Sequence, residues 1–213
     1  MAYDRIGEFK GLHHGKDVFI LASGPSLAGM DLSPLRRRIV MGLNRSSLIY
    51  PDTHYHCTMD ERLFRQFEDV LRKTRYLFTF EDRPFGIPIR LLGSEGFSGD
   101  LEEGIYSGYT VSYFALQVAV YLGFSRVFYL GLDLKHANGQ THFFGNDPVS
   151  RNHERTEFPK MIRMLEYGAA QIAGCGVSVY NCSPNTKLTG FERVSFEWAL
   201  TGSDRPVGSL SES

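Results

Sequence analysis

At 213 residues, with 42% hydrophobic and 22% charged residues, the chain has the composition of a globular protein of one domain or two small ones. The formal net charge is −1 at pH 7, which offers no electrostatic case for binding nucleic acid or an anionic membrane. The three cysteines show no CxxC spacing and are expected to be reduced thiols in the core: Cys57, Cys175 and Cys182.

The N-terminal stretch is polar, and no apolar run approaches the roughly 18 residues that a membrane-spanning helix needs. The sequence therefore predicts neither a signal peptide nor a transmembrane segment. We expect a cytoplasmic protein, and peripheral attachment at the inner membrane stays open.

The first half of the chain alternates strand-like and helix-like segments. The opening strand, DVFILA, is a continuous apolar run of the kind that a doubly covered sheet buries. Residues 81–108 are rich in glycine, proline and short turns, and form an excursion within one domain, with a short strand at 89–92. The remaining predicted elements are strands over 17–22, 38–44, 54–60 and 75–80, and helices over 34–38 and 61–73.

The second half is more strongly patterned. Thr110 is placed to cap a helix that Gly123 ends, and a buried strand follows over 126–134. Residues 137–158 are polar and aromatic without clear periodicity, which favours a lid loop. Pro159 is then expected to open a helix that runs to about Ala173. The last predicted elements are a strand over 177–183 and a short helix over 190–200.

Strands separated by helices predict an α/β fold: a single Rossmann-like domain with a mostly parallel sheet and helices on both faces. The domain spans residues 1–203, and residues 204–213 are expected to be a mobile tail. No internal repeat is visible.

Open parallel sheets bind ligands at the carboxyl ends of their strands, and polar residues follow five of the predicted strands. A further glycine turn, Ser107-Gly108, opens the long apolar helix. These turns match neither a dinucleotide fingerprint nor a Walker loop. Their own residues fit two alternatives, a phosphate-binding turn or a plain connection between a strand and a helix. The strand-end residues are Ser23, Gly24, Pro25, Ser26, Asn44, Asp60, Asp133, Ser183, Pro184 and Asn185.

Two kinds of chemistry are open at this rim. Asp60 and Asp133 could hold Mg²⁺ if they converge, or else serve as a helix cap and a solvated strand end. His142 and His153 fall in the lid segment, where a histidine suits a general base because its pKa lies near neutrality. The alternative is that both are surface histidines without a catalytic role.

The motifs ILASGPSL, IVMGLN, SGYTVSYFALQVAVYLGFSRVFYLGLDL, NGQTHF and VYNCSPNTKL occur in the order that resembles the small bacterial sialyltransferases. The same pieces resemble a related family that contains the archaeal 6-hydroxymethylpterin diphosphokinase and the motility accessory factor glycosyltransferases. The resemblance covers roughly residues 17–60 and 105–190. The resemblance implies that residues 1–203 form a nucleotide-binding transferase domain.

The sialyltransferase resemblance implies a CMP-linked sugar donor, with a glycan or small molecule as acceptor and no metal. It places Ser23, Gly24 and Ser26 near the phosphate and Asn44 at the ribose or sugar. It also implies that Ser107 and Gly108 sit under the donor and that a base pocket is lined by Ser183, Pro184 and Asn185. Members of that family assemble as oligomers, so a homo-oligomer is compatible with the resemblance.

The resemblance also implies catalytic roles. His153 stands where the family's catalytic base lies, and Lys135 and His142 replace two tyrosines that steady the leaving phosphate. The implied reaction is inverting transfer of a sialic-acid-like sugar to a hydroxyl. The acidic Asp60 fits an ATP- and Mg²⁺-dependent diphosphokinase that acts on a pterin-like alcohol better, and this activity is one alternative. A non-catalytic nucleotide-binding protein is the other alternative.

Overall fold

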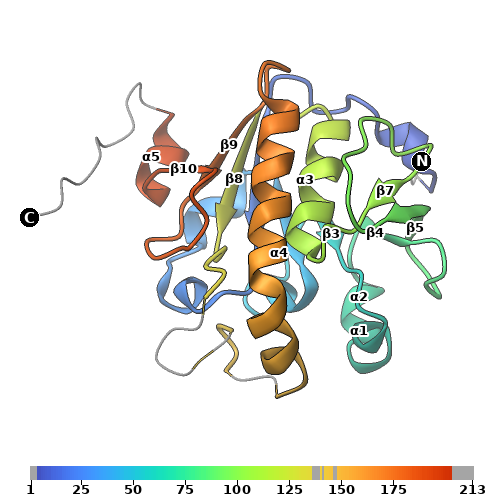
Figure 1. The fold of residues 1–213 in the computed structure, drawn as a ribbon, viewed down its shortest axis with the longest axis horizontal. Coiled ribbons are helices and arrows are strands. Elements are labelled where there is room, and N and C mark those ends of the chain that lie inside the picture. The colour runs from blue at the N-terminus through green and yellow to red at the C-terminus, as the bar shows by residue number, and fades with distance from the viewer. Residues whose placement is uncertain (1–3, 136–139, 141, 146–147, 203–213) are drawn as a thin grey trace, which may run out of the picture.

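The computed structural model describes residues 4–135, 140, 142–145 and 148–202, with the backbone alone at 148–155. The predicted tail at 204–213 and part of the predicted lid lie outside the described residues. Within them, a single sheet of eight strands runs through the molecule in the order β10-β9-β8-β1-β2-β3-β4-β5, and every neighbouring pair is parallel (Figure 1). The fold is thus the predicted α/β domain with a parallel sheet.

The strands are short and highly apolar. In chain order they are β1 (Asp17–Leu21), β2 (Val40–Leu43), β3 (Tyr55–Cys57), β4 (Leu77–Phe80), β5 (Ile87–Ile89), β8 (Arg126–Leu130), β9 (Ser178–Asn181) and β10 (Glu192–Arg193). A separate two-stranded sheet pairs β6 (Leu91–Gly93) with β7 (Ile105–Tyr106). The excursion at 81–108 therefore adds one strand, β5, to the edge of the main sheet.

Helices cover both faces of this sheet. The α-helices are α1 (Glu61–Gln66), α2 (Glu68–Leu71), α3 (Val111–Tyr121), α4 (Pro148–Ile172) and α5 (Phe196–Thr201). Four 3-10 helices complete the described part of the chain: η1 (Ile6–Phe9), η2 (Pro25–Gly29), η3 (Ser33–Arg37) and η4 (Asn44–Leu48).

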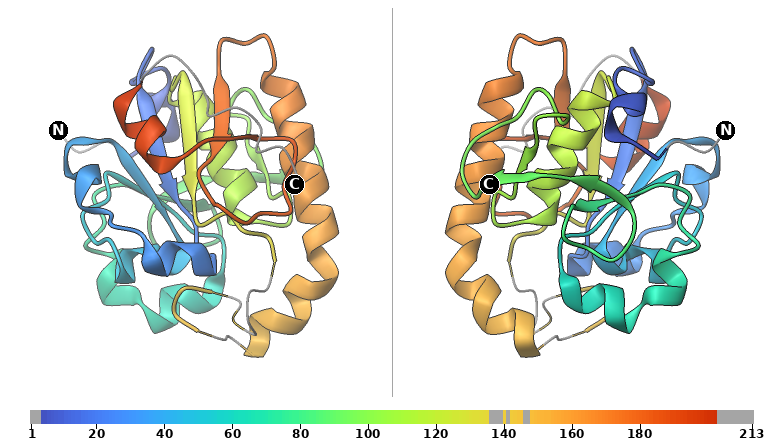
Figure 2. Two further views of the ribbon diagram at one scale, coloured as in Figure 1. Left: turned by 90° about the vertical axis from the view of Figure 1, so that its left-hand side faces the viewer. Right: turned by 90° about the vertical axis from the view of Figure 1, so that its right-hand side faces the viewer.

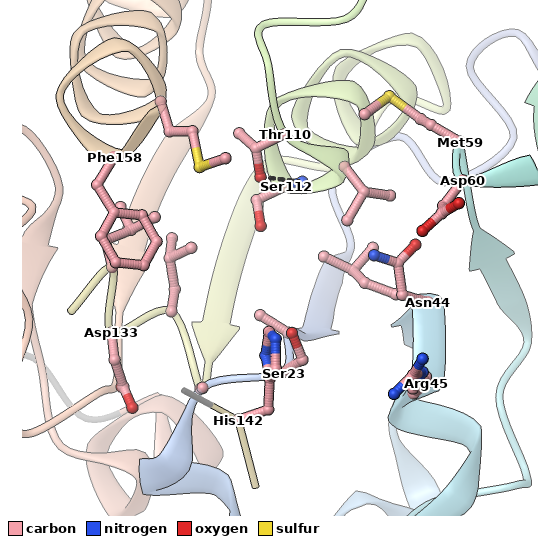
Figure 3. A pocket seen from close by; sticks show the side chains of 18 of the residues that line it. Ser23, Asn44, Arg45, Met59, Asp60, Thr110, Ser112, Asp133, His142 and Phe158 are labelled. Carbon is pink, nitrogen blue, oxygen red and sulfur yellow. Dashed lines mark hydrogen bonds between the residues drawn. The ribbon is translucent and has the colours of Figure 1, made fainter. Parts of the chain in front are cut away.

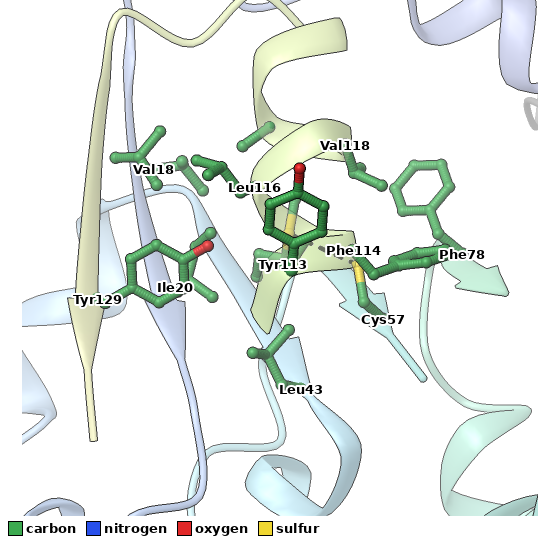
Figure 4. Packing of buried hydrophobic residues seen from close by; sticks show 14 of the residues in the cluster. Val18, Ile20, Leu43, Cys57, Phe78, Tyr113, Phe114, Leu116, Val118 and Tyr129 are labelled. Atoms are coloured by element: carbon green, nitrogen blue, oxygen red, sulfur yellow. Dashed lines mark hydrogen bonds between the residues drawn. The ribbon is translucent and has the colours of Figure 1, made fainter. Parts of the chain in front are cut away.

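Alternation along β1 divides the core in two. Val18 and Ile20 face the layer formed by α3 and α4, where they join the larger hydrophobic cluster (Figure 4). Phe19 and Leu21 face the opposite side, where Leu27 of η2 and residues of η3 and α5 cover them. Both side-chain sets are fully buried, so β1 lies at the centre of the molecule and its carboxyl end is held in place from both faces.

Two predicted helices differ from the structure. The segment 61–73 breaks at Phe67, whose φ of −131° lies outside the helical range, into α1 and α2. The segment after Ser33 is a 3-10 helix, η3, rather than an α-helix.

The largest correction concerns Pro159, which was expected to open a helix. It lies inside α4, which begins at Pro148, so that much of the predicted lid at 137–158 is helical. Proline lacks the N–H that bonds the preceding turn, and helices accommodate this loss by bending. Figure 2 shows the amino-terminal part of α4 bending away from the axis of the rest. The proline signal therefore marked a bend instead of a helix start.

Two smaller corrections concern β8 and a cysteine. The predicted strand 126–134 ends at Leu130 because Gly131 turns the chain with a φ of +72°. Cys57 and Cys182 are buried thiols as expected, but Cys175 is exposed. Among the described residues, no helix combines the length and apolar character needed to cross a membrane.

Candidate functional site

A cleft of about 440 Å³ opens at the carboxyl ends of the central strands. From β1 the chain runs outward through β2 to β5 and then returns to β8 on the other side of β1. This reversal leaves a crevice between the loops that follow β1 and β8, which is where open parallel sheets bind ligands. The cleft's lining includes Ser23, Gly24, Asn44, Arg45, Asp60, Arg62, Thr110, Ser112, Asp133, Lys135, His142 and Phe158.

The amino-terminal end of α3 forms the middle of the cleft (Figure 3). Thr110 caps this helix as predicted, and its hydroxyl accepts the Ser112 N–H at 3.3 Å. Eleven residues of helix then run back through the core. A helix of this length carries partial positive charge at its amino-terminal end, so this end favours an anionic group in the cleft.

The loops after β1 and β8 are joined by a carboxylate clamp. The Ser26 N–H and hydroxyl both donate to the Asp133 carboxylate, at 2.8 Å and 2.5 Å, and Asp133 is only 3% exposed. Gly24 sits under this clamp, where an added Cβ would lie 2.5 Å from the Gly131 carbonyl oxygen and 2.6 Å from a carboxylate oxygen of Asp133. The glycine is needed for this close approach of two loops.

The second carboxylate of the cleft, Asp60, is also bonded within the protein. Its oxygens accept from the Arg62 guanidinium at 2.6–3.1 Å and from the Arg62 N–H at 2.9 Å. Burial raises the pKa of Asp60, but these hydrogen bonds outweigh burial and hold the pKa below its usual value. Asp60 and Asp133 stand on opposite sides of the cleft in Figure 3.

Among the described residues, no group of three or more histidine, cysteine, aspartate and glutamate side chains is placed to hold a metal ion. Each carboxylate proposed as an Mg²⁺ ligand already accepts hydrogen bonds from a neighbouring side chain: Asp60 from Arg62 and Asp133 from Ser26.

A short part of the predicted lid closes one side of the cleft. The Phe143 N–H donates to the Ser23 carbonyl oxygen at 3.0 Å, which ties this segment to the loop after β1. The His142 ring stacks on Phe144, with ring centres 4.6 Å apart, and lines the cleft. Phe144 in turn lies under the Arg45 guanidinium, 4.7 Å from the ring centre.

The structure brings about half of the predicted site residues together in the cleft. Ser23, Gly24, Asn44, Asp60 and Asp133 line the cleft, as do Lys135 and His142. His153 lies within α4, and its side chain falls outside the described residues. The predicted residues that do not line the cleft are Pro25, Ser26, Ser107, Gly108, Ser183, Pro184 and Asn185.

Several of these remaining residues build the walls behind the cleft. The Ser183 hydroxyl accepts the Leu132 N–H at 2.8 Å, which fixes the loop after β8. Gly108, with a φ of +55°, makes room for Tyr113, since an added Cβ would lie 2.2 Å from the tyrosine ring. Both residues act on the shape of the site through their neighbours.

Three further residues of the cleft were not predicted as site residues: Arg45, Arg62 and Phe158. Arg45 and Arg62 each lie one or two residues beyond a predicted strand-end residue, so their position at the rim was a usable signal. Phe158 gives no such signal, because it lies on α4, far along the chain from any strand end. Figure 3 shows its ring on the side of the cleft opposite Asn44.

The fold and its crevice define the chain as an open parallel α/β domain with its cleft at the switch point of the sheet. No protein-family model matches the sequence, and no curated protein matches it either. Among solved structures, it is similar to the sialyltransferase CST-II in complex with a trisaccharide acceptor and CMP, with 17% identity, a TM-score of 0.50, and coverage of 84% of this chain and 86% of that one.

A second similar structure is CstII from Campylobacter jejuni in complex with a substrate analogue, CMP-3FNeuAc. It shares 15% identity, with a TM-score of 0.45 and coverage of 84% of this chain and 85% of that one. At this level of identity, the likeness to the CST-II complex with a trisaccharide establishes that the two proteins share a fold.

Proposed function

We propose that this chain is a glycosyltransferase that moves a sialic-acid-like sugar from a CMP-linked donor to a hydroxyl of a glycan or small-molecule acceptor. The observation that carries the proposal is the cleft at the β1–β8 switch point, into which the amino-terminal end of α3 opens. The shared fold with an enzyme crystallised with CMP and a trisaccharide supports the choice of donor and acceptor.

The charges around the cleft suit a nucleotide phosphate. The helix end of α3 attracts an anion, and Arg45 and Lys135 add positive charge nearby. The carboxylates of Asp60 and Asp133 are engaged with Arg62 and Ser26, which supports binding without a metal bridge.

In the proposed reaction, an acceptor hydroxyl oxygen bonds to the anomeric carbon of the sugar as the bond from that carbon to the phosphate oxygen breaks. CMP leaves with the bonding electrons, and the hydroxyl proton passes to a histidine acting as general base. His142 lines the cleft, and His153 lies on the helix beside it. Lys135 would stabilise the charge on the departing phosphate.

The first experiment tests the nucleotide. Thermal unfolding is measured with CMP, UDP and ATP, each with EDTA and with Mg²⁺. A hundredfold excess over Kd adds about 2.7 kcal/mol of stability, which raises the Tm by about 5–10 °C in a chain of this size. We expect CMP to stabilise the protein equally in both buffers. Stabilisation by ATP and Mg²⁺ alone would contradict the proposal and favour the diphosphokinase alternative.

The second experiment tests the base. CMP release from CMP-N-acetylneuraminic acid is measured with a panel of glycan acceptors for His142→Ala and His153→Ala, with the exposed His14→Ala as control. We expect one of the first two variants to lower turnover by about 10²-fold or more while CMP binding persists. If both variants keep wild-type turnover, neither His142 nor His153 is the base.

A further inference from the structure

Asn44 is held at the cleft by two buried polar side chains, one on β3 and the other directly after it. It follows β2 with a φ of +50°, a left-handed conformation that is uncommon outside glycine. The Nε2–H of His56 donates to its carbonyl oxygen at 2.8 Å, and the Thr58 hydroxyl donates to its Oδ1 at 3.0 Å. Both His56 and Thr58 are 0% exposed.

The His56 ring packs against Gly42, where any larger residue would collide with it. A Cβ added at Gly42 would lie 2.5 Å from Nδ1 of His56 and 2.8 Å from the Ser46 hydroxyl. The Nδ1 atom is buried, and none of the described residues bonds to it. Burying a polar atom without a partner costs stability, so a purely structural explanation leaves this histidine unaccounted for.

The protonation of His56 follows from its contacts. A carbonyl oxygen can only accept, so the proton of the neutral ring is on Nε2 and the bare nitrogen is Nδ1. Burial lowers the pKa of His56 to about 4, and the hydrogen bond to the Asn44 carbonyl only partly opposes this. At neutral pH the ring is therefore an uncharged donor in a single tautomer.

Thr58 sets which end of the Asn44 amide faces the ligand. Its hydroxyl bonds Oδ1, so the other end of the amide, with two N–H donors, is left for the cleft. Figure 3 shows this nitrogen turned toward the middle of the pocket, with the oxygen turned away.

From these contacts we infer that His56 and Thr58 are positioning residues that fix Asn44 so that its amide N–H groups point into the cleft. The ligand atom that meets Asn44 is consequently a hydrogen-bond acceptor, an oxygen of the phosphate or of the transferred sugar. The inference relies on the proposed function for the identity of the ligand. The geometry of Asn44 itself does not depend on it.

The ligand test compares three variants. Thr58→Val removes the hydroxyl at nearly constant shape, and Thr58→Ser keeps it. Ser98→Ala removes another buried hydroxyl, which bonds the Asp100 backbone oxygen away from the cleft. Titration calorimetry in EDTA measures Kd for cytidine, CMP and CMP-N-acetylneuraminic acid.

We expect Thr58→Val to weaken binding of at least one phosphate-bearing ligand about tenfold and to leave cytidine unchanged. Weaker CMP binding assigns the acceptor oxygen to the phosphate, and an effect on the CMP-sugar alone assigns it to the sugar. Thr58→Ser should restore the affinity, and Ser98→Ala should retain it. Unchanged affinities in Thr58→Val, or an equal loss in Ser98→Ala, would overturn the inference.

A second measurement needs no ligand, so it separates this inference from the proposed function. In ¹⁵N-histidine NMR spectra at pH 6, His56 should be neutral, with a protonated Nε2 and a bare Nδ1. An Nδ1–H tautomer or an imidazolium at pH 6 would overturn the inference even if CMP binds. If wild-type protein binds no CMP but His56 has the expected tautomer, the proposed function fails and the positioning of Asn44 stands.

Discussion

The clamp between the loops after β1 and β8 can be tested by Ser26→Ala. The substitution keeps the backbone N–H that donates to Asp133 but removes the hydroxyl that donates at 2.5 Å. Asp133 is 3% exposed, so water does not readily replace this donor. Hydrogen bonds to charged groups contribute about 1.5–3 kcal/mol, and we expect a loss of about 2–3 kcal/mol in the free energy of unfolding. The corresponding decrease in Tm is about 5–10 °C.

The chain contains a matched control for this change. The Ser33 hydroxyl donates to the carboxylate of Asp31 at 3.0 Å, with both residues exposed. Ser33→Ala should therefore leave the unfolding free energy almost unchanged, because water replaces the lost donor. Urea unfolding followed by circular dichroism gives both values. Equal, small losses in the two variants would refute the idea that a buried charge holds these loops together.

Three further predictions follow from the same structure. As the pH drops from 6.5 to about 4, His56 should lower the free energy of unfolding by about 3 kcal/mol, because its ring is protonated in the unfolded chain but stays neutral when buried. A His56→Gln variant should lose this part of the pH dependence in thermal unfolding. Gly108→Ala should cost at least about 3 kcal/mol in urea unfolding, because its Cβ would overlap the Tyr113 ring, whereas Gly174→Ala, in open space at a φ of +82°, should cost only about 1 kcal/mol; equal costs would argue against the packing. Calorimetry should give the same Kd for CMP in EDTA and in Mg²⁺, and a Kd that improves tenfold or more with Mg²⁺ would argue for a metal-bridged phosphate.

The fold was largely predictable because its signals are local. The apolar run of β1, the Thr110 cap and the glycine stop after α3 each depend on a few adjacent residues. The amino-terminal part of α4 was missed because it is polar without clear periodicity, and because Pro159, which lies inside the helix, is also typical of a helix start. The parallel order of the strands followed from their alternation with helices.

The site was less predictable because its key contacts join distant residues. Ser26 was expected to face a phosphate, but its hydroxyl bonds Asp133, 107 residues away. The hydrogen bond from Thr58 to Asn44 depends on the register between β2 and β3, and no local sequence pattern predicts that register. Their sequence positions predicted that these residues lie at one edge of the sheet. The structure shows which of them line the cleft and which support it from behind.

The most direct test of the proposed donor site is a map of CMP on the protein by ¹⁵N–¹H NMR in the presence of EDTA. We predict that amide signals shift at Gly24, Asn44 and Ser112, the three places where the cleft meets the loop after β1, the end of β2 and the start of α3. Those at the far ends of the strands should not move. Shifts confined to another surface, or no shifts at millimolar CMP, would contradict the account.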